Sequence, residues 1–275
     1  MAIQRAQNDA AQRFTSLYNH GFVRVAAVAP VVAPADPATN AETILKFWRE
    51  ADAERAALLL TPELSLSGYA IDDLLLQDVL LDAVDAAVVA VAEATAGLTP
   101  LVVVGAPLRH GNRLYNCAVA IQRGEVLAVA PKAYLPTYRE FYEKRHFASG
   151  AGHQGEFLVR PHWPGADVDG ELPFGPDLIF TPEDLPDLAV HVEVCEDMWV
   201  PVPPSHEAAL AGEPPMARAR RLAVAKAQSL AKEFPGHWIL GSDQVADVGG
   251  QVLDKPGDAA RCAAQLATLS GRIAS

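Results

Sequence analysis

Short runs of apolar residues recur along most of the chain, and each run is bounded by residues that favour turns. Runs of this length and composition predict buried strands. The expected strands cover residues 22–29, 57–60, 101–105, 114–122, 126–130, 179–180 and 188–192. The fourth and fifth runs are separated by an Arg-Gly-Glu sequence at residues 123–125, so we expect these two strands to form a hairpin.

Two segments between these runs carry the spacing of amphipathic helices. In residues 40–56, four large apolar side chains recur at helical spacing: Ile44, Leu45, Phe47 and Trp48. Asn40 is the expected N-cap of this helix, and a second helix is expected over residues 77–95. Residues 150–175 are rich in glycine, proline and histidine, which is typical of a long loop. Because strands and helices alternate and the strands are apolar almost throughout, the pattern predicts an α/β layered fold.

The composition bounds the possible classes of function. With 275 residues, half of them hydrophobic and a fifth charged, the chain can bury a sizeable core as one large domain or as one domain plus part of another. A net charge of −12 argues against sequence-independent binding to nucleic acid or to an anionic membrane surface. The richest apolar stretch, residues 82–107, is interrupted by Asp85, Glu93 and Pro100, so it is not expected to span a membrane.

The three cysteines are Cys117, Cys195 and Cys262, and their spacing fits neither a metal site nor a disulfide framework. The first residues also lack the apolar core of a signal peptide. We therefore expect a reduced, cytoplasmic protein that needs no metal.

Glu63, Lys132 and Cys195 each follow an apolar, strand-like stretch and precede a turn. Side chains placed in this way are expected to meet at one edge of a sheet. A thiol, a carboxylate and an ammonium in contact suit attack on an amide or nitrile carbon. Taken singly, the cysteine is more often a small buried apolar residue, and the other two are more often solvated turn residues. Their joint occurrence favours the catalytic interpretation.

The three groups divide the chemistry between them. A free thiol has a pKa of about 8.5 and is mostly protonated at neutral pH, so it needs a base or a cationic neighbour. Glu63 is the candidate that takes the proton of Cys195 and returns it to the leaving ammonia. Lys132 and the backbone N–H of Glu196 are candidates for stabilising the oxyanion. The expected intermediate is a thioester, which water then hydrolyses.

Several stretches of the chain resemble a known family. They cover residues 18–25, 60–78, 104–109, 131–143 and 191–199. Over residues 14–212 the chain is similar to the amino-terminal glutaminase domain of glutamine-dependent NAD synthetases, a branch of the nitrilase superfamily. The resemblance implies a four-layer α-β-β-α sandwich, the release of ammonia from L-glutamine, and no cofactor. It implies Glu63 as the proton acceptor, Lys132 as the stabiliser of thiolate and oxyanion, and Cys195 as the nucleophile.

The resemblance also implies a substrate pocket. Tyr138 is similar to a glutamine-binding residue, and Tyr69, Phe141 and Glu196 are expected to line the pocket. Core packing is the alternative role for the aromatic side chains. Intact members of the family assemble as homo-oligomers and pass their ammonia to an ATP-dependent synthetase domain, which we expect to be absent from this chain.

Residues 213–275 resemble a different family, the Maf-type nucleoside triphosphate pyrophosphatases. The matching stretches are residues 221–227, 239–246, 250–257 and 265–272. This resemblance implies Asp243 as a catalytic or metal-side carboxylate and Lys255 as a phosphate contact. However, Asp254 stands where a glycine is usual, and the Ser…Arg-Arg phosphate cradle of that family is not found. We therefore favour a turn carboxylate for Asp243.

These resemblances predict a glutaminase domain over residues 1–212, incomplete at its C-terminal end, followed by a Maf-like fragment over residues 213–275. The fragment is expected to contain a helix at 216–233, a strand at 238–241, a hairpin through 247–250 and a helix at 258–269. The favoured function is hydrolysis of L-glutamine. Two alternatives stay open: an inactive remnant acting at most as an interaction module, because the family's Ser/Arg glutamine clamp is not found, and a nucleotide pyrophosphatase.

Overall fold

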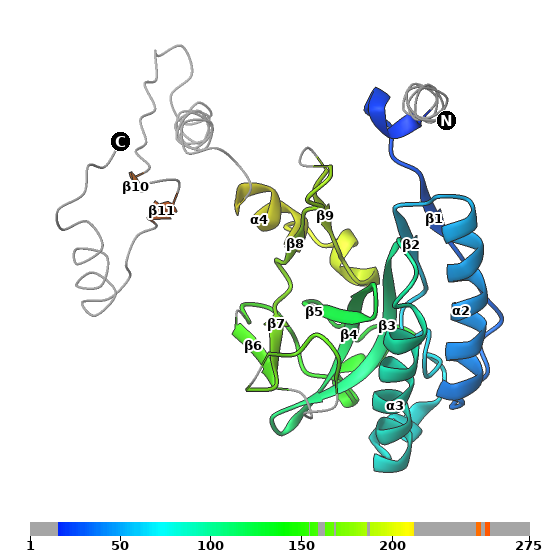
Figure 1. The fold of residues 1–275 in the computed structure, drawn as a ribbon. Helices are drawn as coiled ribbons and strands as arrows, with labels where there is room; N and C mark the ends of the chain where they lie inside the picture. The colour runs from blue at the N-terminus through cyan, green and yellow to red at the C-terminus, as the bar shows by residue number, and fades with distance from the viewer. Residues whose placement is uncertain are drawn as a thin grey trace, which may run out of the picture. The chain divides into compact units, whose positions relative to one another are not determined.

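The computed structural model describes residues 16–153, 155–158, 163–167, 169–185, 188–211, 246–248 and 251–253. Contacts divide the chain into two compact units, residues 1–205 and 206–275, and each is described by itself. The first unit is built around one large sheet with helices packed on it (Figure 1). The predicted α/β class is therefore confirmed, while the four-layer arrangement stays a prediction.

The large sheet has the strand order β1-β2-β3-β4-β5-β7-β6. Its strands are β1 (Val25–Ala27), β2 (Leu58–Leu60), β3 (Leu101–His110), β4 (Arg113–Gln122), β5 (Glu125–Pro131), β6 (Gly155–Leu158) and β7 (Glu171–Phe174). β1, β2 and β3 run parallel, and β3, β4 and β5 form an antiparallel meander. The register between β4 and β5 shifts by one residue at Ala120 and Ile121. Since β2 and β5 point the same way, their C-terminal ends lie toward the same edge of the sheet.

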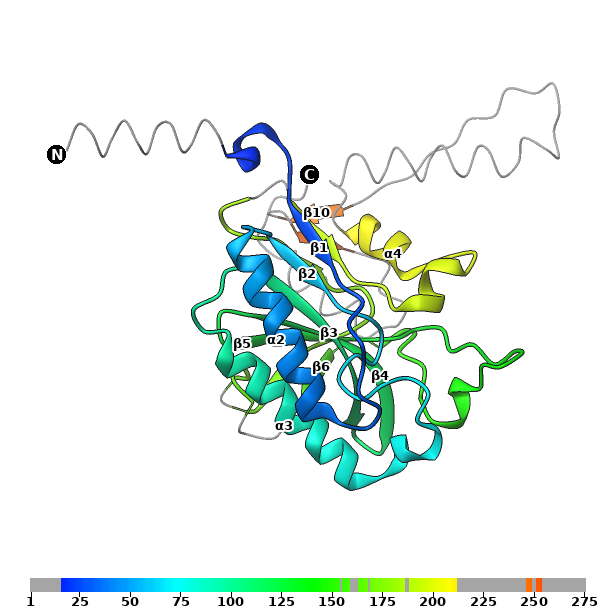
Figure 2. The ribbon, with the colours of Figure 1, turned by 90° about the vertical axis from the view of Figure 1, so that its right-hand side faces the viewer.

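Two helices cover one face of the sheet, α2 (Pro37–Ala53) and α3 (Asp78–Ala94), as Figure 2 shows. Ile44 and Trp48 of α2 and Val84, Val88 and Val91 of α3 are fully buried, and their spacing of three and four residues places them on the sheet-facing side of each helix. Both helices lie where the apolar spacing predicted them. The main hydrophobic core of the unit lies between these helices and the sheet.

The opposite face of the sheet carries a smaller apolar cluster. Val103 and Ala118 lie in neighbouring strands and alternate with residues that face the helices, so they point to the other side. They pack with Val194, just after a two-stranded antiparallel sheet, β8 (Ile179–Phe180) and β9 (Val190–His191). The segment that leads to Cys195 is thereby held against this second face.

Four short 3₁₀ helices and three further elements complete the described chain. They are η1 (Leu17–His20), η2 (Asp72–Leu76), η3 (Glu143–Arg145), η4 (Cys195–Trp199), α4 (Pro204–Ala211), β10 (Ala246–Val248) and β11 (Gln251–Leu253). In the second unit, β10 and β11 pair antiparallel with Val248 opposite Gln251, which confirms the hairpin expected there. The other elements expected after residue 212, together with Asp243 and Lys255, lie outside the described residues. Within the described part of the chain, no helix has the length and apolar character needed to cross a membrane.

The predicted N-cap of the first long helix was wrong. The helix begins at Pro37, and Asp36 is the cap, its carboxylate accepting a hydrogen bond of 3.1 Å from the backbone N–H of Thr39. Proline at the first helical position and aspartate before it are both favoured there. Asn40 instead lies inside the first turn, where its buried amide bonds to the backbone of Ala33 and Leu66.

Three strand predictions also need correction. The predicted loop at residues 150–175 contains the antiparallel pair β6 and β7, because Phe157, Leu172 and Phe174 are buried between exposed or half-buried neighbours. Their alternation is short and interrupted, so it gave little signal. β1 is shorter than the predicted strand at residues 22–29, and β3 extends five residues beyond the predicted end at residue 105.

Candidate active site

Glu63 and Lys132 follow the C-terminal ends of β2 and β5. The turn that carries Glu63 is fastened to β3, where the backbone N–H of Leu66 donates to the carbonyl of Gly105 at 3.0 Å and the Gly105 N–H donates to Ser65 Oγ at 3.0 Å. Lys132 continues the β4–β5 ladder, since its backbone N–H donates to the carbonyl of Asn116 at 2.8 Å. The expected meeting at one sheet edge is thus confirmed for these two residues.

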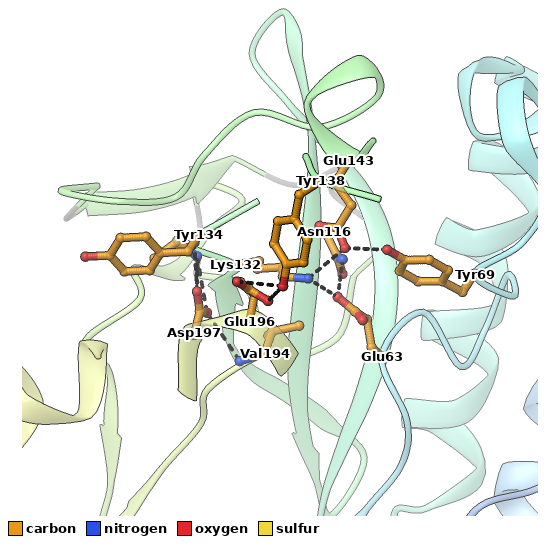
Figure 3. A network of polar contacts seen from close by, with 11 residues as sticks. Glu63, Tyr69, Asn116, Lys132, Tyr134, Tyr138, Glu143, Val194, Glu196 and Asp197 are labelled. Atoms are coloured by element: carbon orange, nitrogen blue, oxygen red, sulfur yellow. Dashed lines mark hydrogen bonds and ion pairs between the residues drawn. The ribbon is translucent and has the colours of Figure 1, made fainter. Parts of the chain in front are cut away.

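Lys132 is the centre of a buried polar network (Figure 3). Its side chain is 0 % exposed, and its Nζ donates to Glu63 Oε1 at 2.6 Å and to Glu143 Oε1 at 2.7 Å. Burial alone lowers the pKa of an ammonium, but the two carboxylates outweigh it and raise the pKa of Lys132 above its ordinary value. Lys132 therefore stays charged at neutral pH.

Two members of this network were missed by sequence reasoning. Glu143, only 4 % exposed, also accepts a hydrogen bond from the Tyr69 hydroxyl at 2.7 Å. Burial raises the pKa of Glu143, although Lys132 and Tyr69 act in the opposite direction. Asn116 is buried and donates from its side-chain amide to Glu63 Oε1 at 2.7 Å. The available signal for Asn116 was a polar residue inside an otherwise apolar strand run.

Cys195 opens η4, directly after the segment that follows β9. It therefore reaches the site from the smaller two-stranded sheet, and the expectation that all three side chains belong to one sheet edge was wrong for Cys195. Its φ of 48° lies in the left-handed region, which is uncommon for a residue with a side chain and recurs at functional sites. The residue is exposed on one side, and its thiol lies near enough to Glu63 and Lys132 for the charges of both to act on it.

The electrostatic surroundings keep the Cys195 sulfur protonated. Partial burial and the negative charge of Glu63 raise the pKa of the thiol, and Lys132 only partly offsets them. The Glu63 and Glu143 carboxylates act against a negative charge on the sulfur and Lys132 acts in its favour, and the balance disfavours a resting thiolate. The arrangement suits a thiol that loses its proton to a neighbouring carboxylate during attack.

The residues expected to bind substrate gather beside this network. The hydroxyl of Tyr138 donates to Glu196, at 2.9 Å to Oε2 and 3.2 Å to Oε1. The ring of Phe141 lies edge-on to Tyr138 and to Tyr69, with centroids 5.8 and 6.5 Å apart. Tyr138 is 51 % exposed, so it is available to a ligand rather than packed in the core. The structure brings these residues together, and their role in binding stays a prediction.

Comparison with known proteins identifies the family to which the chain belongs. Residues 24–230 match the family model described as carbon-nitrogen hydrolase. The chain belongs to the carbon-nitrogen hydrolase family. This carbon-nitrogen hydrolase is 55 % identical to the glutamine-dependent NAD(+) synthetase of Mycobacterium tuberculosis over 199 residues. The matched region covers 72 % of this chain and 28 % of the relative. Identity to the Mycobacterium leprae protein of the same name is 52 % over 199 residues. The chain thus spans little more than a quarter of the length of the curated relatives it matches.

Solved structures support the fold of this carbon-nitrogen hydrolase. A glutamine-dependent NAD(+) synthetase from Cytophaga hutchinsonii superposes with a TM-score of 0.55 at 27 % identity, covering 63 % of this chain and 28 % of that one. The enzyme of that name from Acinetobacter baumannii gives 0.51 at 23 % identity, covering 72 % and 35 %, which supports the fold alone.

The C-terminal part of the chain matches a second group. Residues 188–275 match the model described as Maf-like protein, and this range overlaps the carbon-nitrogen hydrolase match. A 7-methyl-GTP pyrophosphatase from Xanthomonas campestris is 52 % identical over 71 residues, which is 26 % of this chain and 37 % of that protein. Within the described residues, no group of three or more side chains is arranged to hold a metal ion.

Proposed function

We propose that this carbon-nitrogen hydrolase converts L-glutamine to glutamate and ammonia through a thioester on Cys195. The observation that carries the proposal is the grouping of three chemical functions: a buried, charged Lys132 is bonded to Glu63, and the charges of both act on the nearby Cys195 thiol. The similarity to glutamine-dependent NAD(+) synthetases supports glutamine as the substrate.

In the first step the Cys195 sulfur attacks the carboxamide carbon while its proton passes to Glu63. Because the thiol pKa is raised, proton transfer accompanies the attack and does not precede it. The carbonyl oxygen becomes an oxyanion, which the charged Lys132 and the backbone N–H of Glu196 stabilise. Loss of one such donor typically reduces the rate by about 10²–10³-fold.

Collapse of the tetrahedral intermediate breaks the carbon–nitrogen bond, and Glu63 gives its proton to the departing ammonia. The acyl group is left as a thioester. Glu63, again a carboxylate, then takes a proton from water as the oxygen attacks the thioester carbon. Return of that proton to the sulfur releases glutamate and restores the resting thiol, so Glu63 acts as base and then as acid in each half of the reaction.

The other side chains of the site position Lys132 and bind the substrate. Glu143 accepts a second hydrogen bond from the Lys132 ammonium and so helps to fix its position. Tyr69 and Phe141 form an aromatic wall, and Tyr138 with Glu196 offers a hydroxyl and a carboxylate for the α-substituents of glutamine. A charged α-ammonium suits the carboxylate of Glu196.

We further propose a domain organisation, an assembly and a reaction partner for this protein. The glutaminase domain covers residues 1–212 and the Maf-like fragment residues 213–275, in a cytoplasmic homo-oligomer. Its ammonia is consumed by an ATP-dependent synthetase partner, and the similarity to mycobacterial glutamine-dependent NAD(+) synthetases supports a synthetase as that partner. Size-exclusion chromatography with light scattering measures the oligomeric state directly.

The test is ammonia release from L-glutamine by the wild type, Cys195→Ala and Cys117→Ala. Cys117 is the matched control, because its thiol is buried in β4 and burial raises its pKa well above the ordinary value. The expected result is activity in the wild type and Cys117→Ala and none in Cys195→Ala. Intact mass after treatment with a glutamine-like diazoketone is expected to show one adduct, which Cys195→Ala lacks. An unchanged rate in Cys195→Ala would exclude the mechanism.

The similarity to a 7-methyl-GTP pyrophosphatase favours one second candidate, hydrolysis of a nucleoside triphosphate involving Asp243 and Lys255. It predicts magnesium-dependent pyrophosphate release that Asp243→Asn abolishes. If neither pyrophosphate nor ammonia is released and Cys195 forms no adduct, the chain is the inactive remnant.

A further inference from the structure

The carboxylate of Asp197 joins two segments that are far apart in the sequence. Its Oδ1 accepts the backbone N–H groups of Tyr134 at 2.7 Å and Ala133 at 3.1 Å, and its Oδ2 accepts that of Val194 at 3.3 Å. Figure 3 shows Asp197 between Tyr134 and Val194, beside the Lys132 network. Two of the three donors directly follow Lys132, and the third directly precedes Cys195.

This bonding pattern exceeds what the local helix requires. An acidic residue in the first turn of a short helix needs only the N–H at the start of that turn, here Val194, three residues before Asp197. Ala133 and Tyr134 lie more than sixty positions earlier in the sequence. They follow β5 of the large sheet, whereas Val194 follows β9 of the small one. Asp197 therefore links two sheets as well as capping its own turn.

Burying the carboxylate of Asp197 between these two segments costs desolvation free energy. Asp197 is 2 % exposed, and burial raises its pKa, while the three backbone N–H groups and then Lys132 act to lower it. A buried carboxylate is tolerated when it accepts several hydrogen bonds, and here those bonds come from peptide groups on either side of the site. An apolar residue would leave three backbone N–H groups without this acceptor, two of them in buried hydrogen bonds.

We propose that Asp197 is a positioning residue, which fixes the Lys132 ammonium and the Cys195 sulfur relative to each other by holding the backbone next to both. The proposal rests on the proposed function in one respect, the assignment of Lys132 and Cys195 to the reaction. Asp197 touches neither substrate nor the reacting atoms. It acts through the peptide groups of residues 133, 134 and 194.

The test uses Asp197→Asn, which keeps the side-chain shape but turns an N–H₂ group toward backbone N–H donors. At least one of the three hydrogen bonds is lost and the amide nitrogen faces an N–H group, so the link between the two segments is weakened and Lys132 is no longer fixed relative to Cys195. Among the charged groups that act most strongly on the thiol, Glu63 and Glu143 raise its pKa and Lys132 lowers it. Weaker contact with Lys132 therefore moves iodoacetamide alkylation of Cys195 to higher pH.

The direction of this shift separates positioning from charge. Loss of the Asp197 charge alone, with the geometry intact, would favour the thiolate and move the alkylation profile to lower pH. We expect an upward shift of about one unit, which lowers the alkylation rate near neutral pH about tenfold. For glutamine hydrolysis we expect kcat to fall about 10²-fold, as for a misplacement near 1 Å, with little change in KM. An unchanged or downward-shifted profile would overturn the proposal.

Asp36→Asn is the matched control. Asp36 also accepts a backbone N–H with its carboxylate, that of Thr39 at the start of α2, but it lies outside the site. It is expected to leave the alkylation profile unchanged. Cys195 alkylation does not depend on glutamine turnover, so absence of glutaminase activity in the wild type would reject the proposed function and leave this test intact.

A measurement on the wild type covers the case in which Asp197→Asn does not fold. Hydrogen exchange followed by NMR is expected to show slow exchange for the amides of Ala133, Tyr134 and Val194, since all three donate to one buried carboxylate. Exchange of the Ala133 and Tyr134 amides at the rate of unprotected loop amides would show that the link is not formed, and the proposal would be wrong.

Discussion

Replacing Gly105 by alanine is expected to displace Glu63 without touching any side chain of the site. Gly105 lies in the middle of β3, paired with Ala118 of β4. A Cβ atom at this position would lie 2.2 Å from the backbone nitrogen of Leu64 and 2.6 Å from the carbonyl oxygen of Pro62. Both atoms belong to the turn that carries Glu63, so the strand and the turn cannot keep their present separation.

The size of the effect follows from these distances. Ordinary van der Waals contact begins at 3.4 Å, so the turn must retreat by about 1 Å, because β3 is fixed by strands on both sides. Overpacking of this kind typically costs about 1–3 kcal/mol of unfolding free energy. The two hydrogen bonds between Gly105 and the turn are also at risk, at about 1 kcal/mol each. A 1 Å displacement of Glu63 from Lys132 and Cys195 is expected to reduce turnover about 10²-fold.

Urea unfolding and glutamine turnover measure the two effects separately. Gly97→Ala is the control, because its added Cβ would meet no atom within 4 Å and its backbone needs no left-handed conformation. That variant is expected to be neutral or more stable by up to about 1 kcal/mol, with normal turnover. If Gly105→Ala matched Gly97→Ala in both measurements, the inferred contact between β3 and the Glu63 turn would be refuted.

Two further pairs of variants test the electrostatics of the site and the hydrogen bonds of Asn40. Glu63→Gln should move alkylation of Cys195 to lower pH, because the Glu63 charge raises the thiol pKa. Lys132→Met should move it to higher pH, because the Lys132 charge lowers that pKa. Shifts of the same sign in the two variants would contradict this account. Asn40→Ala should lower the unfolding free energy by about 2–3 kcal/mol in urea, because a buried side chain loses three hydrogen bonds to the backbone. The exposed Thr43→Ala in the same helix should change it by less than about 0.5 kcal/mol, and equal losses would show that the Asn40 bonds contribute nothing.

Sequence reasoning succeeded where a pattern is local. The spacing of Ile44 and Trp48 located α2, and the apolar run of β3 located a strand buried on both faces. Sequence reasoning failed where the role of a residue depends on hydrogen bonds to residues far away in the sequence. Asn40 has the chemistry of an N-cap, yet its amide is used by backbone groups of a loop and a turn outside the helix.

The residues of the site also divide into those that local sequence identifies and those that it does not. Glu63, Lys132 and Cys195 stood out because each carries reactive chemistry at the end of an apolar run. Asn116 and Asp197 carry no reactive chemistry of their own, and their contacts join residues more than fifty positions apart. Such contacts depend on how the strands are ordered in the sheet, which spacing along one chain does not reveal.

The one-residue register shift between β4 and β5 has a consequence for the lysine. On the hairpin side of the shift, Ile121 pairs with Val126, and beyond it Ala120 pairs with Ala128. The extra residue, a β-bulge, advances β5 by one position, so Asn116 receives its backbone hydrogen bond from Lys132. Without the bulge, Asn116 would face Pro131, which has no N–H to donate, and Lys132 would turn to the other side of the sheet. The bulge therefore decides that the residue beside Glu63 is Lys132 and not its neighbour Pro131.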